Sequence, residues 1–483
     1  MKRLQPYLPI LALFCLALLV RIIYNVTVGK GYIAHYDSST YEKIALHMLN
    51  EHCFCLNPMD ATVGRAPLWP GVIAGIYAVL GHKNSFVRFF LCFIGAGTCM
   101  LVSLFSRDIF GRRIGIVAGI SAAVYPGLFL YDGWLYSESL YTFLLLACTY
   151  TLYLTQQTAK YRWMIVSGLL LGLLSLTRPN GLIVLTLVFV WAIIAIRAKW
   201  LSWRAAVRSV VIITVLALAI VTPWTVRNYL VSHHVVPVAT GDGIVLLGAY
   251  NHLILDDGPF RGIWIRPSLV YPQGGQIYSP CRADCEVRQN GDYSHMAGQW
   301  VEEHLAEMPY LLCLHMKYLW TPSTPEADLP MNQFPARLSS KIVMAIIPIT
   351  SYLVFALAAL GLLLTWRKWR HLLFIYLLIL VNIGQSLYFY GSSRFRAPIE
   401  PMLVILAAGA IWWLSQRWHT LRSYHRTSNG SLPEQTPITG MESRESGFSH
   451  HINSHVSNRD IRNSSICCQF VRDGISVFGG IIM

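Results

Sequence analysis

Long runs of apolar residues recur along this chain, separated by short polar connections. About ten of these runs are interpreted as membrane-crossing helices, which typically need roughly 20 apolar residues, although several runs here are shorter. They lie at about residues 8–24, 86–105, 114–131, 140–154, 163–177, 182–196, 207–222, 342–364, 372–390 and 402–414. The pattern predicts an all-α polytopic membrane protein.

Basic residues concentrate in alternate connections between the runs. Cytoplasmic loops carry an excess of Lys and Arg, so this bias sets the orientation. With the N-terminus inside, the inner segments hold Lys2, Arg3, Arg107, Arg112, Arg113, Lys160, Arg162, Arg197, Lys199, Arg204, Arg208, Arg367, Lys368, Arg370, Arg417, Arg422 and Arg426. The short outer connections hold only Arg178, Arg394 and Arg396. We therefore predict a cytoplasmic N-terminus, and a retained first helix because no small-residue cleavage site follows it.

The runs divide the chain into six segments. The first helix (1–24) leads into a first outer loop (25–85), in which a second apolar stretch at 68–80 is expected to lie on or dip into the membrane interface. Helices two to seven (86–222) precede a large outer loop or cap (223–341), which is rich in Gly, Pro, Tyr and Trp. The last three helices (342–415) precede a polar cytoplasmic tail (416–483) that is expected to be disordered.

Composition excludes a soluble globular protein. Of 483 residues, 54% are hydrophobic and 13% are charged, about half the charged fraction of ordinary domains. The formal charge of +14 lies mostly in short loops. Membrane orientation explains it, so no nucleic acid partner is expected.

Unusual polar residues gather at the predicted outer ends of the runs, where charges indicate a functional site. Asp37 is followed by Tyr41 and an amphipathic stretch through Met48. If that stretch is helical, its dipole keeps the carboxylate ionised. The other candidates are Arg65, Asp132, Glu138, Arg178, Arg227, Arg394 and Arg396.

These residue types suit a substrate with a phosphate head and a hydrocarbon tail. The guanidinium fork matches phosphate oxygens and stabilises a departing phosphate. A nearby carboxylate can take a proton from an attacking hydroxyl. The combination indicates group transfer from a lipid-linked phosphate.

Six motifs follow one another along the chain: Tyr36-Asp37-x-x-x-Tyr41, Arg65-Ala-Pro67-Leu-Trp-Pro70, Ser137-Glu138, Leu176-Thr177-Arg178-Pro179, Pro223-Trp224-Thr-Val-Arg227-Asn228-Tyr229 and Arg394-Phe-Arg396-Ala-Pro398. Their order resembles that in the GT-C membrane glycosyltransferases over roughly residues 8–415. More closely, it resembles the bacterial branch related to dolichyl-phosphate-mannose protein mannosyltransferases and to the lipid A aminoarabinose transferase.

The resemblance implies a GT-C-like bundle with two long outer loops and a site at the outer face of the inner membrane. It implies a polyprenyl-phosphate sugar donor, a lipid, glycan or protein acceptor, and contact with membrane lipid. Asp37 matches the family's first-loop acid, the base or metal-site acid. Several relatives have Asp-Glu there and this chain has Asp37-Ser38, so a divalent metal and the acceptor class stay open. The expected substrate-binding residues are Tyr41, Arg65, Glu138, Arg178, Arg227, Arg394 and Arg396.

Simpler roles compete for several of these residues. Asp37 could be only a helix N-cap, Glu138 only the first acid of a helix, and Arg178 only an interface anchor. His233-His234 is interpreted as plain surface. Cys53-Phe-Cys55 and Cys281-Arg-Ala-Asp-Cys285 lie in outer loops, where disulfides form. A disulfide is favoured over a zinc site built from His52, Cys53 and Cys55, and Cys281 is predicted to bond to Cys285.

Two other functions compete with sugar transfer. A flippase or other transporter of lipid-linked saccharides should carry its polar residues near the middle of the bilayer. An oligosaccharide polymerase or ligase shares the outer loops and arginines but lacks the early first-loop acid. The polar residues here lie at the outer ends, which favours the glycosyltransferase.

Overall fold

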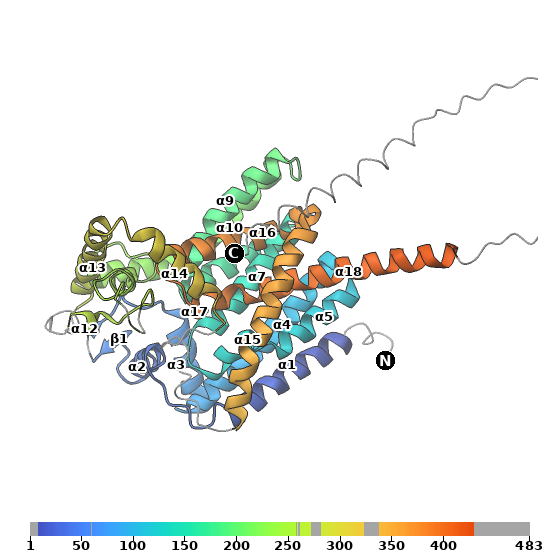
Figure 1. Ribbon diagram of the computed structural model, residues 1–483. Coiled ribbons are helices and arrows are strands. Elements are labelled where there is room, and N and C mark those ends of the chain that lie inside the picture. The colour runs from blue at the N-terminus through green and yellow to red at the C-terminus, as the bar shows by residue number, and fades with distance from the viewer. Residues whose placement is uncertain are drawn as a thin grey trace, which may run out of the picture. The chain divides into compact units, whose positions relative to one another are not determined.

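The computed structural model describes residues 8–58, 60–256, 258, 261–271, 282–322 and 338–428, with only the backbone described for 338–340 and 419–428. Helices dominate this part of the chain (Figure 1). The elements are α1 (Leu8–Thr27), α2 (Asp37–Asn50), β1 (Cys55–Asn57), β2 (Asp60–Ala61), α3 (Leu68–Leu80), α4 (Asn84–Phe110), α5 (Arg112–Val124), α6 (Pro126–Phe129), η1 (Leu130–Gly133), α7 (Glu138–Thr158), α8 (Tyr161–Thr177), α9 (Gly181–Arg197), α10 (Trp203–Ser232), α11 (Asp242–Ala249), α12 (Pro267–Val270), α13 (Ala283–Glu303), α14 (Met308–Trp320), α15 (Leu338–Leu364), η3 (Trp366–Lys368), α16 (Trp369–Tyr388), α17 (Ser393–Arg396), η4 (Ala397–Ile399) and α18 (Glu400–Ser428).

Every apolar run that was predicted to cross the membrane contains helix. In the described part, six helices are long and apolar enough to span a bilayer, or seven if α5 and its bent continuation form one broken span. Helices α8 and α9 are apolar but shorter, with 17 residues each. The multi-pass, all-α class is confirmed, and the count of about ten spans stays a prediction.

The third predicted span is not one helix. Between Arg112–Val124 and Pro126–Gly133 the chain bends by 69°. Proline lacks an N–H group and disfavours helical geometry in the residue before it, and Tyr125 is accordingly extended (φ −78°, ψ 116°). The break turns the chain inward, so Asp132 and Glu138 are both buried rather than exposed in a turn.

The seventh predicted span continues beyond its expected end. Helix α10 runs through Pro223 to Ser232, although a proline often ends a helix. Tertiary hydrogen bonds stabilise the extra turns: Trp224 Nε1 donates to the Val238 carbonyl (2.8 Å) and Asn228 Nδ2 to the Val236 carbonyl (3.0 Å). Arg227 therefore lies on a rigid helix and not in the large loop.

Two further boundaries bear on the predictions. The apolar stretch at 68–80 forms helix α3 (Leu68–Leu80). Helix α18 continues to Ser428, so the expected disorder from 416 is wrong for 416–428. This segment has several residues with good intrinsic helix propensity, such as Leu, Arg and Gln. Residues 429–483 lie outside the described part, and a disordered tail there stays a prediction.

Small residues let the helices approach closely. Helix α4 packs against α1, α5 and α7, and α8 packs against α7 and α10. A Cβ atom on Gly168 or Gly172 of α8 would lie 2.8 Å or 2.7 Å from side chains of α10. Substitution there would force the two helices apart. A second apolar core joins α11, α13, α14 and the connection between α16 and α17. It contains Leu246, Trp300, Leu311 and Tyr390.

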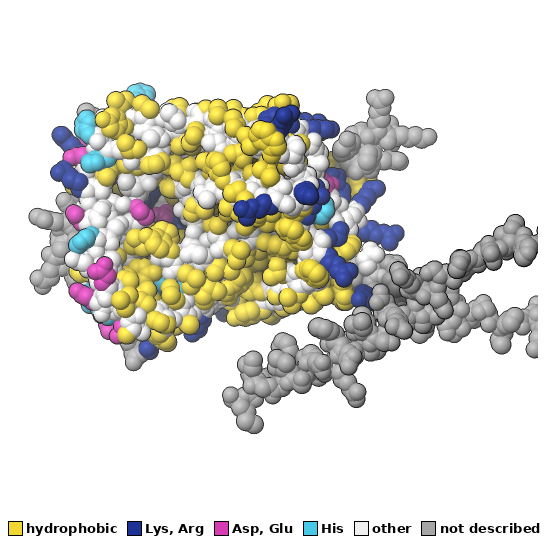
Figure 2. Space-filling model, turned by 90° about the horizontal axis from the view of Figure 1, so that it is seen from above, with side chains coloured by type: hydrophobic (Ala, Val, Ile, Leu, Met, Phe, Trp, Pro, Cys, Tyr) yellow, Lys and Arg dark blue, Asp and Glu magenta, His cyan; other side chains and the backbone are white. Residues whose placement is uncertain are grey.

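The basic connections lie together at one end of the bundle. Lys368 Nζ donates to the Ile109 carbonyl (3.3 Å), and the Arg370 guanidinium lies 5.4 Å from the ring centre of Trp200. Figure 2 shows many Lys and Arg side chains at one end of the apolar surface, with most of the visible acidic and His side chains toward the other. This separation fits the orientation predicted from the loop charges.

We expect reporter fusions after Gly111, Lys160 and Lys199 to lie in the cytoplasm and a fusion after Gly258 to lie outside. The reason is the excess of Lys and Arg in the three former connections. Alkaline phosphatase and fluorescent-protein fusions at each position measure this. An external signal at Lys199 would contradict the orientation.

Candidate active site

Asp37 is presented by the start of helix α2 (Asp37–Asn50). Tyr36 precedes it with a positive φ of 51° and is the N-cap residue, without a side-chain cap. The Asp37 carboxylate instead accepts from Arg65 Nη2 through Oδ1 (3.2 Å) and from Arg394 Nη2 through Oδ2 (2.7 Å). The alternative role of Asp37 as an N-cap is therefore wrong.

The surroundings of Asp37 favour its ionised form. Burial raises the pKa of Asp37, but the charges of Arg394 and Arg65 outweigh burial, so its pKa lies well below the ordinary range. The side chain is still 30% exposed. Asp37 is thus a carboxylate with access to solvent or substrate.

Glu138 is the first residue of α7 and is fully buried. Its Oε1 accepts from Arg178 Nη1 (2.8 Å) and also from Arg394 Nε. A buried carboxylate needs such partners, because an unpaired one would cost several kcal/mol. Arg394 consequently bridges the two carboxylates, which come from segments 101 positions apart in the chain.

Five residues from five parts of the chain thus form one cluster, which we call the arginine–carboxylate cluster. It consists of Asp37, Arg65, Glu138, Arg178 and Arg394. Three guanidinium groups face two carboxylates, which leaves one formal positive charge in excess. Tyrosine rings support two of the cations: Tyr136 lies 4.5 Å from Arg394 and Tyr141 lies 5.8 Å from Arg178.

The cluster retains capacity for an anionic ligand. The side chain of Arg65 is 35% exposed, against 19% for Arg178 and 11% for Arg394. Among the described residues, Arg65 Nε has no hydrogen-bond partner. A surplus cation with a free donor matches the phosphate chemistry expected from the sequence.

Tyr41 lies one helical turn after Asp37 and is half-buried. Burial raises its pKa, and the Asp37 charge adds to that effect. Arg65, Arg178 and Glu138 also act on it electrostatically, which places the phenol beside the cluster.

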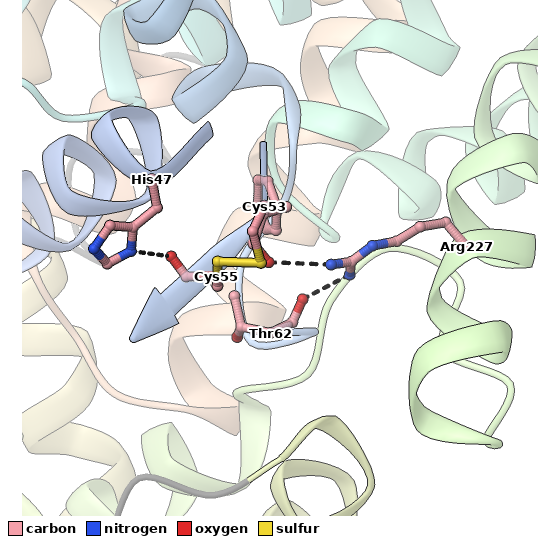
Figure 3. Close-up of a disulfide and its surroundings, with 6 residues drawn as sticks. His47, Cys53, Cys55, Thr62 and Arg227 are labelled. Atoms are coloured by element: carbon pink, nitrogen blue, oxygen red, sulfur yellow. Dashed lines mark hydrogen bonds between the residues drawn. A yellow bond between two sulfur atoms is a disulfide. The ribbon is translucent and has the colours of Figure 1, made fainter. Parts of the chain in front are cut away.

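Arg227 and Arg396 lie elsewhere. Arg227 Nη1 donates to the Thr62 carbonyl (2.7 Å) and Nη2 to the Phe54 carbonyl (3.1 Å), as Figure 3 shows beside the Cys53–Cys55 disulfide. Arg396 is buried and pairs with Glu400 (2.6 Å). Both guanidinium groups are committed to protein partners, and none of these partners in the described part of the chain belongs to the cluster.

We expect Arg396 to stabilise the folded protein. It also donates to the carbonyls of Thr321 (2.9 Å) and Pro322 (3.3 Å) at the end of α14. Arg396→Met should lower the thermal unfolding midpoint strongly, because breaking a buried pair costs about 3–5 kcal/mol. The double variant Arg396→Met/Glu400→Gln should recover part of this loss. Equal midpoints for wild type and Arg396→Met in detergent would contradict the assignment.

The sequence did not single out a second buried ion pair. Arg21 Nε donates to Asp132 Oδ2 (2.7 Å), and Asn25 Nδ2 donates to the Asp132 backbone carbonyl (3.3 Å). Asp132 thus belongs to the packing of α1 against α4 and η1 and not to the cluster. The signal was present, because Arg21 is a charge inside the first apolar run.

The cluster does not fit a divalent cation. Within the described residues, no group of three or more His, Cys, Asp and Glu side chains could hold a metal ion. The two carboxylates of the cluster direct oxygens at guanidinium groups, and a further cation there would meet three positive charges.

The cysteines predicted to form a pair are only partly described. Cys53 and Cys55 form a disulfide (Figure 3). Cys285 also takes part in a disulfide. Its predicted partner, Cys281, lies outside the described residues, so that pairing stays a prediction.

An apolar groove of about 580 Å³ is lined by residues that are close in the sequence to two arginines of the cluster. It lies between the start of α3, the end of α8 and α10, and is lined by Pro67, Leu68, Gly71, Val72, Leu176, Ile220, Pro223 and Trp224. Pro67 follows Arg65 by two residues, and Leu176 precedes Arg178 by two. The groove therefore starts close to two of the cluster's arginines.

Comparison with known proteins gives one family match. The family model described as dolichyl-phosphate-mannose-protein mannosyltransferase matches residues 64–226. That range contains Arg65, Glu138 and Arg178 and leaves out Asp37 and Arg394. Among curated proteins, no sequence matches this chain significantly.

Solved structures match over most of the chain. The archaeal oligosaccharyltransferase AglB from Archaeoglobus fulgidus, in complex with an inhibitory peptide and a dolichol-phosphate, superposes with a TM-score of 0.53 and 14% identity, covering 90% of this chain and 53% of that one. The Archaeoglobus fulgidus oligosaccharyltransferase tethered with an acceptor peptide gives 0.53 and 12% identity, with the same coverage.

ArnT from Cupriavidus metallidurans bound to undecaprenyl phosphate matches with a TM-score of 0.38 and 15% identity over 88% of this chain and 81% of that one. At this TM-score the likeness carries no weight. The chain spans about half the length of the oligosaccharyltransferases. Their likeness confirms the predicted GT-C fold class.

Proposed function

We propose that this protein is a membrane glycosyltransferase that moves a sugar from a polyprenyl-phosphate donor to an acceptor hydroxyl on a lipid, glycan or protein. The observation that carries the proposal is the arginine–carboxylate cluster, together with an apolar groove whose lining residues Pro67 and Leu176 lie two positions along the chain from Arg65 and Arg178. A phosphate head would meet Arg65, Arg178 and Arg394, and the start of a hydrocarbon tail would lie in the groove. The family match and the shared fold support the same reaction class.

The charged side chains of the cluster have different roles in the proposed reaction. Asp37 accepts the proton of the acceptor hydroxyl, whose oxygen forms a bond to the anomeric carbon of the sugar. The bond from that carbon to the donor phosphate breaks, and its electron pair stays on the phosphate oxygen. Arg394 and Arg65 stabilise the resulting charge. Glu138 holds Arg394 and Arg178 in place, and the proton leaves Asp37 to solvent.

The position of the charges favours transfer over transport. Asp37 and Glu138 begin helices, Arg178 follows the end of α8, and Arg394 lies in the short α17. A transporter would be expected to carry such groups near mid-bilayer. By the loop charges, the cluster faces the outside of the inner membrane.

A substitution in the groove tests the proposed binding of the hydrocarbon tail and leaves every residue of the cluster unchanged. A Cβ atom at Gly71 would meet no heavy atom within 4 Å, and the same is true one turn on at Gly75, which does not line the groove. The Cβ atom of Gly71→Leu therefore has room, and we expect the rest of the side chain to occupy the groove. We expect it to weaken binding of long-chain polyprenyl phosphate about tenfold, which corresponds to roughly one or two buried CH₂ groups.

Gly75→Leu is the matched control, because it makes the same change on the same helix. Binding of long-chain polyprenyl phosphate to purified protein measures the effect, with inorganic phosphate and the free polyprenol as competitors. Equal affinities for wild type and Gly71→Leu would mean that the hydrocarbon tail does not bind in the groove. No binding to the wild-type protein would overturn the proposed function. Mass spectrometry of glycolipids and glycoproteins from a deletion strain identifies the acceptor.

A further inference from the structure

The segment that carries Arg65 has no regular structure of its own. Strands β1 (Cys55–Asn57) and β2 (Asp60–Ala61) pair antiparallel, with Cys55 opposite Ala61. The chain then runs irregularly from Thr62 to Pro67 before α3 begins. Ordering an irregular segment costs conformational entropy, which other contacts must offset. Something outside the segment must therefore hold the Arg65 guanidinium against Asp37.

Arg227 supplies the first anchor, from helix α10. Its two terminal nitrogens donate to the carbonyls of Thr62 and Phe54, which flank the strand pair on both sides. Its guanidinium lies 4.7 Å from the ring centre of Trp224 and 5.3 Å from that of Phe54. Phe54 is the residue between the two cysteines of the Cys53–Cys55 disulfide.

Glu286 supplies the second anchor, from helix α13 of the large loop. Its carboxylate accepts from Thr62 Oγ1 (2.8 Å) and from the Val63 amide (2.8 Å). Thr62 Oγ1 in turn accepts from the Gly64 amide (3.0 Å). An apolar contact accompanies these bonds, because Val63 packs in one cluster with Val231, Val236, Ala283 and Val287.

A third contact joins the strand pair to the helix of the candidate base. His47, on α2, makes a hydrogen bond with the Cys55 carbonyl (2.9 Å). The segment before Arg65 is therefore held by the Asp37 helix, by a membrane helix and by the large loop. The Arg227 guanidinium binds the carbonyl, and the Glu286 carboxylate binds the N–H, of the single peptide group that joins Thr62 to Val63.

We propose that Arg227 and Glu286 are positioning residues that act through Arg65. They fix residues 62–63 and so set the place of the Arg65 guanidinium, which binds the donor phosphate. The inference rests on the proposed function. It also gives the large loop a role in sugar transfer, since α13 helps to build the phosphate site from a distance.

The expected result is a loss of donor affinity that depends on Arg65. Glu286→Ala and Arg227→Met should each weaken binding of polyprenyl phosphate about tenfold or more and raise the donor KM, with a smaller change in kcat. Arg65→Ala should weaken it about 10- to 100-fold, as expected for a charge-assisted hydrogen bond. In the Arg65→Ala background, Glu286→Ala should cause no further loss.

The double-variant comparison separates positioning from general destabilisation, because independent effects multiply. Asp284→Asn is the matched control: it lies on the same helix in an exposed pair with Arg288 and should bind as the wild type does. Hydrogen exchange of residues 62–66 should increase in Glu286→Ala even without ligand.

Three outcomes overturn the inference while leaving the proposed function intact. They are normal affinity in Glu286→Ala and Arg227→Met, full multiplication of the Glu286→Ala and Arg65→Ala effects, or wild-type affinity in Arg65→Ala. Failure of the wild-type protein itself to bind polyprenyl phosphate or to transfer sugar overturns the proposed function instead.

Discussion

Arg394→Ala should lower turnover about 10²–10³-fold while the protein still folds. Arg394 is the one residue whose guanidinium contacts both Asp37 and Glu138 within the described structure. Removing a preorganised donor from a developing negative charge typically costs this much in rate. Glu138 keeps Arg178 as a partner, so its buried charge is not left alone.

Arg394→Lys should fall between the wild type and the alanine variant. Lysine keeps the charge, but its ammonium is a point donor and lacks the planar fork that reaches two carboxylates at once. Transfer of radiolabelled sugar by purified protein, as separate kcat and KM values, measures the difference.

Arg396, on the same short helix, is the contrasting position. Its substitution should lower the unfolding midpoint, whereas substitution of Arg394 should lower turnover more than stability. Arg288→Ala, at an exposed position on α13, should do neither. Full turnover in Arg394→Ala would remove the phosphate role from the candidate site.

The helices were predictable because their signal is local. Apolar runs of about 20 residues in a membrane protein leave few alternatives to a helix. The exceptions occurred at prolines, where the outcome depends on tertiary contacts. Pro126 breaks its helix, whereas Pro223 lies inside a helix whose residues Trp224 and Asn228 donate hydrogen bonds to the irregular segment that follows it. The sequence shows both prolines but not their partners.

The candidate site was predictable in its members more than in its geometry. Asp37, Tyr41, Arg65, Glu138, Arg178 and Arg394 were all expected, from their places in the predicted outer segments or from the family resemblance, and the structure brings them together. Arg227 and Arg396 carried the same signal and lie in other networks. Which arginine meets which carboxylate depends on the packing of segments 28 to 357 residues apart, and no local pattern encodes that.

Asp37→Asn should lower turnover about 10²–10⁴-fold, the usual effect of losing a general base. Asparagine keeps the size of the side chain and removes its ability to take the proton. Capping does not confound the result, because Tyr36 is the N-cap residue and both carboxylate oxygens of Asp37 face arginines. Expression level and melting temperature serve as controls for folding. Turnover like that of the wild type would move the search for the base to Glu138.

The pH dependence adds a test of how Asp37 and its arginines work together. In the free protein the charges of Arg394 and Arg65 hold the pKa of Asp37 well below its ordinary range, which makes it a weak base. A donor phosphate bound to those arginines would offset their charges, and the pKa of Asp37 would rise toward the working pH. Donor binding would then strengthen the base at the moment when it is needed.

The expected result is a difference between two pH profiles. Activity is lost as the pH falls through the pKa of Asp37, because the protonated acid cannot accept a proton. The profile of kcat/KM reports the free enzyme and that of kcat the complex, so the acid limb of kcat should lie at the higher pH. In Arg65→Ala, the acid limb of kcat/KM should also move to higher pH, since one of the two lowering charges is gone. Coincident acid limbs for kcat and kcat/KM, unchanged in Arg65→Ala, would mean that Asp37 does not titrate in the reaction and that its carboxylate only orients the arginines.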